Sequence, residues 1–320
     1  MQAIQGAYTR AWLSANLRRS DTVHLHWPSF LYSSPQTGPT ARSIARYLAL
    51  LASIRGRGAA PVWTAHNLLP HDSGRARLAH KVVRHATIRL SRAVFAHGPS
   101  AARIIAQGFP EASGKLHVIP HGHWVGYYKN QISRTEARAR LDLGNEFTYL
   151  FLGQCRPYKD LLTLISAFSR QTGAIRLIIA GQFKSATYRA EVERAANGDS
   201  RIRVVDCHVP DDDLQVYLNA ADCMVLPYVE SLTSGACVLA MSFGLPVVAP
   251  AVGSLCDLLT ASTGVAYDRR NPDGLVDAMR TAQARQFSRE TVRGFVERYG
   301  FDLAAGKLAA VAREHALGYR

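Results

Sequence analysis

Short apolar runs of strand length alternate with longer segments of helical periodicity along the whole chain. In the first half, four such runs end near a histidine or a proline, and their apolar content predicts buried strands. These expected strands are residues 22–26, 61–65, 93–97 and 116–119, and the helical segments between them are 41–55, 76–92 and 100–107. Strands and helices in alternation predict a parallel sheet with helices on both faces.

The second half repeats this alternation with sharper boundaries. Its five expected strands are 148–152, 176–180, 202–206, 223–226 and 246–249, and its expected helices are 161–169, 188–196, 212–220 and 235–243. A final helical pattern over 289–316 is interrupted at Tyr299-Gly300. The pattern therefore predicts two Rossmann-like, doubly wound α/β domains that face a cleft, with ligands bound at the carboxyl ends of the strands.

The length of 320 residues exceeds the usual size of one hydrophobic core, so two main domains are expected. We place the first domain at residues 1–140 and the second at 141–288. The C-terminal helices at 289–320 are expected to pack back toward the first domain. The chain opens on a helical pattern at 3–17 with no strand before it. A doubly wound domain usually begins with a strand, so we expect the first strand to be missing or this domain to be trimmed.

Positive charge is concentrated in the first domain. Residues 1–144 carry 19 Lys and Arg against 5 Asp and Glu, whereas residues 145–320 carry 19 of each. This asymmetry predicts an anionic partner for the first domain. An anionic membrane surface would attract such a cluster by about 1 kcal/mol per basic residue. A nucleic acid is not expected as the partner, because the second half would then go unexplained.

The segment 75–92 is a candidate for contact with a membrane, although a helix with its basic face in water is an equally good interpretation. Helical spacing places three apolar residues on one face and three basic residues on another: Leu78, Val82 and Ala86, and Arg77, Lys81 and Arg84. The longest strongly apolar stretch, at 47–54, is too short to span a bilayer, and no signal peptide is expected. We therefore expect a cytoplasmic protein, peripheral on the inner face of the cell membrane.

Signatures of metals and cofactors are missing from the sequence. The five cysteines lie in the second half and form no CxxC pair, so buried reduced thiols are expected rather than disulfides or a metal site. No Asp-x-Asp follows a predicted strand, and the acidic run at 211–213 lies at a helix start. Neither a P-loop nor a GxGxxG fingerprint is present. We expect no cofactor and no metal.

The first candidate site is the segment Gly153-Gln-Cys-Arg156-Pro-Tyr-Lys159, between a predicted strand and a predicted helix. Its position places two cations on a loop at a carboxyl strand end, beside a helix N-terminus. An arginine fork together with a lysine point charge suits a diphosphate. A solvated Arg/Lys pair is the alternative from charge alone.

The second candidate site is Thr233-Ser234-Gly235, just before the helix expected at 235–243. Two hydroxyl groups and the unpaired N–H groups of a first helical turn can together bind an anion. Plain N-capping of the helix is the alternative, because serine and threonine are common N-caps.

These segments resemble the nucleotide-sugar-binding half of GT-B glycosyltransferases over about residues 145–280. The motifs G-x-x-R-P-Y-K, L-I-I-A-G, A-D-C-M-V-L-P-Y and A-M-S-F-G-L-P-V-V-A follow one another in the order that this superfamily uses. The resemblance implies that Arg156 and Lys159 hold the donor diphosphate of a nucleotide-sugar and that residues 233–235 cradle a phosphate. It also places six residues near the nucleoside or sugar: Gly153, Gly181, Gln182, His208, Tyr228 and Glu230.

The sequence departs from the retaining members of this superfamily. Those enzymes carry a glutamate before A-M that pairs with a second glutamate, and here the positions hold Leu239 and Ser231, with Glu230 displaced by one residue. The remaining pattern resembles bacterial exopolysaccharide transferases, such as the xanthan-type β-mannosyltransferases, which use GDP-mannose and invert. The resemblance therefore implies an inverting mannosyltransferase that acts on a lipid-linked saccharide acceptor in exopolysaccharide or glycolipid synthesis.

The first half is similar to the same branch in two segments. His24-Leu-His26-Trp27-Pro28 and the run from Trp63 to Asp72 look like its H-W-P-E and W-T-x-H-N-x-x-P-H-E motifs, with Ser29 and Asp72 in place of glutamate. An inverting transfer needs a base for the acceptor hydroxyl, and we take His66 as the first candidate and Asp72 as the second. Five further residues are expected near the acceptor: His26, Trp27, Asn67, His71 and His121.

Two competing interpretations remain at this point. A retaining glycosyltransferase of the same fold would use a UDP-sugar, with Glu230 doing the work of the displaced glutamate. A relative that binds a nucleotide-sugar or a polyanion without catalysis would explain the missing first strand.

Overall fold

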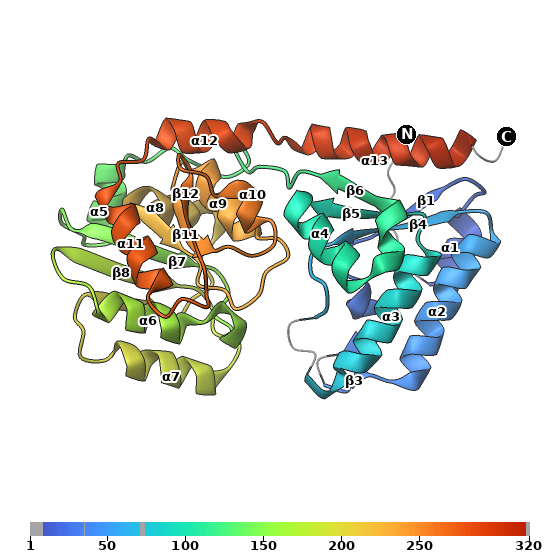
Figure 1. The fold of residues 1–320 in the computed structure, drawn as a ribbon, viewed down its shortest axis with the longest axis horizontal. Coiled ribbons are helices and arrows are strands. Elements are labelled where there is room, and N and C mark those ends of the chain that lie inside the picture. Colours follow the sequence, from blue (N-terminus) through green and yellow to red (C-terminus); the bar gives the residue numbers. More distant parts are fainter. Residues whose placement is uncertain (1–8, 35, 71–73, 318–320) are drawn as a thin grey trace. The chain divides into compact units, whose positions relative to one another are not determined.

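The computed structural model describes residues 9–34, 36–70 and 74–317, and the chain forms two compact units (Figure 1). Unit 1 comprises Met1–Pro120 with Phe301–Arg320, and unit 2 comprises His121–Gly300. These limits differ from the boundaries expected from the sequence, because residues 121–140 join unit 2. The two C-terminal helices also separate, since α12 (Arg289–Glu297) belongs to unit 2 and α13 (Phe301–Leu317) to unit 1.

Unit 1 is built on a parallel sheet in the order β1-β4-β5-β6. Its strands are β1 (Thr22–Leu25), β4 (Ala60–Ala65), β5 (Ala93–His97) and β6 (Leu116–Ile119), and a small hairpin pairs β2 (Ser33–Ser34) with β3 (Gly38–Pro39). The helices are α1 (Arg10–Asn16), α2 (Ala41–Gly56), α3 (Arg77–Leu90), α4 (Pro99–Gly108) and α13. All four expected strands are therefore confirmed.

Apolar side chains on both faces hold the unit 1 sheet. The six side chains of β4 are all buried, which explains why this strand reads as a continuous apolar run in the sequence. Helices α2 and α3 lie side by side against the sheet (Figure 1). Val311 of α13 packs with Phe95 and Ile119, so the last helix belongs to this core. The helix expected at 3–17 is α1, and residues 1–8 lie outside the described part of the chain.

Unit 2 carries a parallel sheet in the order β12-β11-β10-β7-β8-β9. Its strands are β7 (Phe147–Leu152), β8 (Ile175–Ala180), β9 (Ile202–Val205), β10 (Cys223–Val225), β11 (Val247–Pro250) and β12 (Gly264–Tyr267). Its helices are α5 (Arg134–Arg140), α6 (Leu161–Ser169), α7 (Ala186–Ala196), α8 (Leu214–Ala220), α9 (Gly235–Ser242), α10 (Leu255–Leu258), α11 (Gly274–Ala284) and α12. The sequence did not indicate β12, α10 or α11.

Two findings bear on expectations from composition. No helix among the described residues is long and apolar enough to cross a bilayer. The five cysteines form no disulfides with one another; Cys155, Cys223 and Cys237 are buried and Cys207 is partly buried. Cys256 is exposed, so the expectation of buried thiols was wrong for this residue, which lies on the short helix α10 that the sequence did not indicate.

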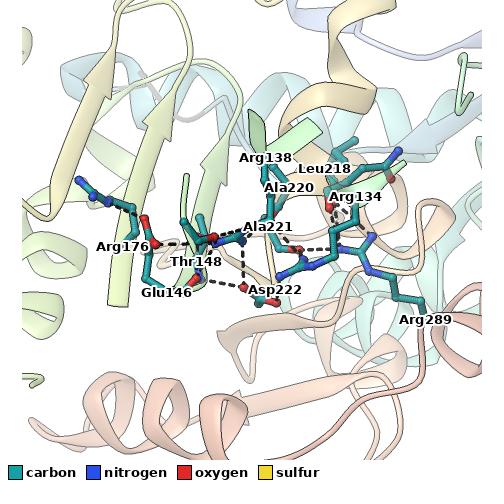
Figure 2. Close-up of polar contacts among 12 residues, drawn as sticks. Arg134, Arg138, Glu146, Thr148, Arg176, Leu218, Ala220, Ala221, Asp222 and Arg289 are labelled. Atoms are coloured by element: carbon teal, nitrogen blue, oxygen red, sulfur yellow. Dashed lines mark hydrogen bonds and ion pairs between the residues drawn. The ribbon is translucent and has the colours of Figure 1, made fainter. Parts of the chain in front are cut away.

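A buried arginine ties α5 to the amino ends of the central strands of unit 2 (Figure 2). Arg138, 7% exposed, donates from Nε to the Gly144 carbonyl at 2.8 Å and from Nη1 to the Ala220 carbonyl at 2.9 Å. Its Nη1 also lies 3.6 Å from the carboxylate of Asp222. That carboxylate accepts from the backbone N–H of Thr148 in β7 at 2.8 Å.

Two more arginines donate to the last carbonyls of α8. Arg134 donates to Ala221 at 3.1 Å, and Arg289 donates to Leu218 at 3.3 Å (Figure 2). A helix C-terminus carries unpaired carbonyls and a partial negative charge, so three guanidinium groups stabilise it. Helices α5 and α12 are thereby fixed to the end of the sheet opposite the carboxyl ends of its strands.

We predict that Arg138→Met lowers the free energy of unfolding by about 3 kcal/mol, because the Gly144 and Glu146 carbonyls lose their guanidinium partner and Asp222 loses one of its two arginine partners. Denaturant unfolding followed by circular dichroism measures this loss. Arg140→Met is the matched control: this exposed arginine on the same helix pairs with Glu136, and a loss of about 0.5 kcal/mol or less is expected. Equal losses for both variants would contradict a special role for Arg138.

Candidate active site

The loops after β7, β8 and β10 lie at one edge of the unit 2 sheet, because these neighbouring strands are parallel. The loop after β7 contains Arg156 and Lys159, the loop after β8 contains Gly181 and Gln182, and the loop after β10 leads to Gly235 at the start of α9. The predicted donor-binding residues therefore gather at the carboxyl edge, where doubly wound folds bind ligands.

The first two of these loops pair through their backbones. Cys155 donates its N–H to the Gln182 carbonyl at 3.0 Å. A Cβ atom on Gly181 would lie 1.8 Å from the Gly153 carbonyl oxygen, so only glycine permits this approach. The structure thus gives Gly181 a role in bringing the loops together, against the backbone of Gly153.

Lys159 is held between aromatic rings. Its Nζ lies 3.4 Å from the ring centre of Tyr228 and 5.0 Å from that of Tyr158. Burial, together with the neighbouring guanidinium of Arg156, lowers the pKa of Lys159 to about 7. An anion bound beside these two cations would restore the full charge of the lysine.

Tyr228 was expected near the nucleoside or sugar, but its side chain is only 2% exposed. It acts instead as a platform under Lys159. Burial raises the pKa of its hydroxyl, which stays protonated at neutral pH. Gln182, His208 and Glu230 are exposed on the loops that follow β8, β9 and β10, so they are available to a ligand.

A clasp that the sequence did not reveal connects the β7 and β10 loops. Arg269 donates to the carbonyl of Pro227 at 2.7 Å and to that of Tyr228 at 3.1 Å, and it pairs with Asp160 at 2.9 Å. Asp160 adopts a left-handed conformation (φ 54°) immediately before α6. The signal available in the sequence was an aspartate directly after the G-x-x-R-P-Y-K motif and an arginine 109 residues later, which is too common a pair of residues to identify a contact.

At the start of α9, the capping interpretation applies to Ser234, whose hydroxyl accepts from the Cys237 N–H at 3.2 Å. The Thr233 hydroxyl is buried and has no hydrogen-bond partner among the described residues. His121 belongs to the same unit. Its side chain lies close to the start of α9, because a Cβ on Gly235 would be 3.6 Å from the Nε2 atom of His121. Burial lowers the pKa of His121, whose Nδ1 donates to the Gly122 carbonyl at 2.9 Å. His121 therefore lies beside the predicted phosphate site.

Unit 1 carries four histidines at the carboxyl ends of neighbouring strands: His24 and His26 at β1, His66 at β4 and His97 at β5. A hydrogen bond of 2.9 Å joins His26 Nδ1 to His66 Nε2, and the ring of Trp27 stacks on His66 with centres 4.5 Å apart. His24 Nε2 lies 2.7 Å from the Thr64 hydroxyl. The structure thus brings together the two segments of the first half, residues 24–28 and the run that begins at Trp63, that carry the motif resemblance in the sequence.

Two of these imidazoles, His24 and His26, are kept neutral by burial. Burial, reinforced by His26 and His97, lowers the pKa of His24 to about 3, and burial also lowers the pKa of His26. His97 contributes to this cluster but was not among the predicted site residues, although it ends an expected strand as His66 does. Asn67 follows His66 and is partly buried, while His71 and Asp72 lie outside the described residues.

No group of three or more His, Cys, Asp and Glu side chains in the described part of the chain is arranged to hold a metal ion. Unit 2 offers cations and a helix N-terminus that can neutralise a diphosphate, and unit 1 offers imidazoles that can accept a proton.

We predict that the affinity for a nucleotide-sugar falls as the pH rises above about 7, by up to about tenfold per unit, because binding requires protonated Lys159. Calorimetric titration from about pH 6 to about pH 9 measures this dependence. Lys159→Arg, which stays charged throughout, should remove it, and Lys159→Gln should give weak, pH-independent binding. A wild-type affinity that is constant over this range would contradict the prediction.

Comparisons with known proteins agree with this geometry. Residues 146–284 match the family described as "Glycosyl transferases group 1". A GDP-mannose:glycolipid 4-beta-D-mannosyltransferase of Xanthomonas campestris is 30% identical over 239 residues, which are 74% of this chain. The matched region spans 63% of that enzyme's length.

Two solved structures share the fold. Sucrose-phosphate synthase from Thermosynechococcus elongatus has a TM-score of 0.70 at 20% identity, covering 93% of this chain and 73% of its own. Anabaena Alr3699/HepE in complex with UDP and glucose has a TM-score of 0.69 at 15% identity, covering 93% of this chain and 77% of its own. The expected GT-B fold is confirmed, and residues 146–284 are similar to the group 1 glycosyl transferases.

Proposed function

We propose that this protein is an inverting glycosyltransferase that moves mannose from GDP-mannose to a lipid-linked saccharide acceptor. The Xanthomonas relative is named for a GDP-mannose donor and a glycolipid acceptor, which supports this choice of substrates. The observation that carries the proposal is the placement of Arg156 and Lys159 at the carboxyl edge of the unit 2 sheet, where the loop after β10 also leads into α9.

The donor would bind with its diphosphate at these two cations. Cleavage of the bond between the sugar and the diphosphate leaves negative charge on the phosphate oxygens. Arg156, Lys159 and the first N–H groups of α9 would stabilise this charge as it develops. The partly neutral state of Lys159 in the free protein suits this role, because an approaching anion increases its charge.

Inversion follows from a single displacement. The acceptor hydroxyl oxygen forms a bond to the anomeric carbon while the bond to the diphosphate breaks, and the hydroxyl proton passes to a base. Leu239 occupies the position at which retaining relatives carry glutamate, and an apolar side chain cannot take part in charge stabilisation there. His66 is our first choice for the base and Asp72 the second.

The acceptor would reach unit 1 at a membrane surface on the inner face of the cell membrane. Leu78 is 73% exposed and Val82 56% exposed on α3, and the neighbouring Arg77 and Lys81 are also exposed. This pairing of exposed apolar and basic side chains fits a helix that lies on an anionic bilayer. Arg84, predicted for the basic face, is buried instead and stacks on Trp63 at 4.1 Å.

We predict that Arg156→Ala weakens binding of GDP-mannose by tenfold or more, because it removes a charge-assisted contact to the diphosphate. Calorimetry measures the affinity, and Arg170→Ala, an exposed arginine that pairs with Asp273, serves as the control with unchanged affinity. Wild-type binding by the Arg156 variant would overturn the donor site.

The stereochemistry of the transfer is tested by NMR of the product. Inversion predicts a β-linkage, and an α-linkage would favour the retaining alternative.

We predict that the double substitution Leu78→Ser and Val82→Ser reduces co-flotation with phosphatidylglycerol vesicles by several-fold while donor binding is retained, since it removes two exposed apolar side chains. Leu162→Ser, which alters an exposed leucine on α6 of unit 2, is the control and should float as the wild type does. Equal flotation of all three proteins would exclude α3 as the contact.

A further inference from the structure

A hydrogen bond joins the imidazole rings of His26 and His66. His26 follows the last residue of β1, and His66 follows the last residue of β4. Because these strands are parallel neighbours, both imidazoles project from the same edge of the sheet. Their rings are inclined by only 22°, and the contact is made by Nδ1 of His26 and Nε2 of His66 at 2.9 Å.

A neutral imidazole has one donor nitrogen and one acceptor nitrogen, so this bond permits two arrangements. In one, His26 donates from Nδ1 and fills the lone pair on His66 Nε2. In the other, His66 donates from Nε2 to His26 Nδ1, and the lone pair of His66 is then on its own Nδ1. Only the second arrangement leaves His66 a base while the bond is kept.

We propose that His26 is a positioning residue for His66, accepting its Nε2–H and thereby holding it in the basic tautomer. This inference rests on the proposed function, in which His66 removes the acceptor proton. The hydroxyl proton passes to His66 Nδ1, the oxygen forms its bond to the anomeric carbon, and the diphosphate departs with the electron pair of the broken bond. The His66 imidazolium keeps its bond to His26 throughout. A neutral imidazole here takes the place that a carboxylate has in serine hydrolases.

The surroundings are compatible with this arrangement. Burial lowers the pKa of His26, so His26 is neutral and can accept a hydrogen bond at neutral pH. Trp27 stacks on His66 at an angle of 15°, which fixes the plane of the ring and presents a π face to the imidazolium. The other titratable groups of the described cluster that face this pair are His97, beside His66, and His24, beside His26. Both are imidazoles, and they disfavour a positive charge on His26 in addition to the one that His66 acquires.

The test combines transfer kinetics with nitrogen NMR of the histidines. His26→Phe keeps a ring but lacks an acceptor, and kcat should fall about 10- to 100-fold with KM for the nucleotide-sugar unchanged. His26→Asn offers Oδ1 in place of Nδ1 and should recover most of this loss. His26→Asp adds a negative charge, and the acidic limb of the kcat–pH profile should move up by about one unit. His117→Phe, in β6 beside Phe95, is the control with unchanged kcat.

NMR of the protein without substrates should show a proton on His66 Nε2, and in His26→Phe both tautomers should be populated. A proton on Nδ1 of His66 in the wild type, or a wild-type kcat in His26→Phe, would overturn the proposal. The variant His66→Ala distinguishes a failure of the role proposed for His26 from a failure of the proposed function. Activity retained in His66→Ala removes His66 as the base, whereas activity lost there but kept in His26→Phe removes only the role of His26.

Discussion

The buried guanidinium of Arg138 is the interaction on which the arrangement of unit 2 depends. It bridges the segment before β7, the end of α8 and the carboxylate of Asp222, and Asp222 in turn joins the start of β10 to β7. A buried charge with its hydrogen bonds satisfied tolerates little displacement, because every shift leaves a desolvated group unpaired. The two central strands are therefore fixed at their amino ends, far from the ligand edge.

The same principle operates at the opposite edge on a smaller scale. Arg269 holds two backbone carbonyls of the β10 loop and the Asp160 carboxylate of the β7 loop. The loops that carry Arg156 and Lys159 are thus positioned by a charged clasp rather than by apolar packing alone. A site that must stabilise charge formed during a reaction gains from being rigid before the substrate arrives, since little reorganisation is then required.

Unit 2 is suited to stabilising an anion and unit 1 to accepting a proton, and in both units burial lowers the pKa values of basic side chains. Burial lowers the pKa of Lys159 in unit 2 and the pKa values of His24 and His26 in unit 1. For the lysine, an anionic ligand reverses the effect and draws the group into its charged form. For the histidines, burial preserves the neutral rings that accept hydrogen bonds and protons. The excess of basic residues in the first half of the sequence thus concerns the surface of that part of the chain. The pKa values at the candidate sites depend instead on how deeply each side chain is buried.

The sequence by itself determined the alternation of strands and helices, the GT-B fold and the segments that carry the predicted donor site, because continuous apolar runs and loop motifs are local patterns. It did not indicate β12, a four-residue strand whose pattern is too short to be distinctive. It did not identify the pairing of Asp160 with Arg269, the burial of Arg84 or the contact of His26 with His66. Those features join residues 40 or more positions apart, or depend on which face of a helix is covered, so only the tertiary structure decided them.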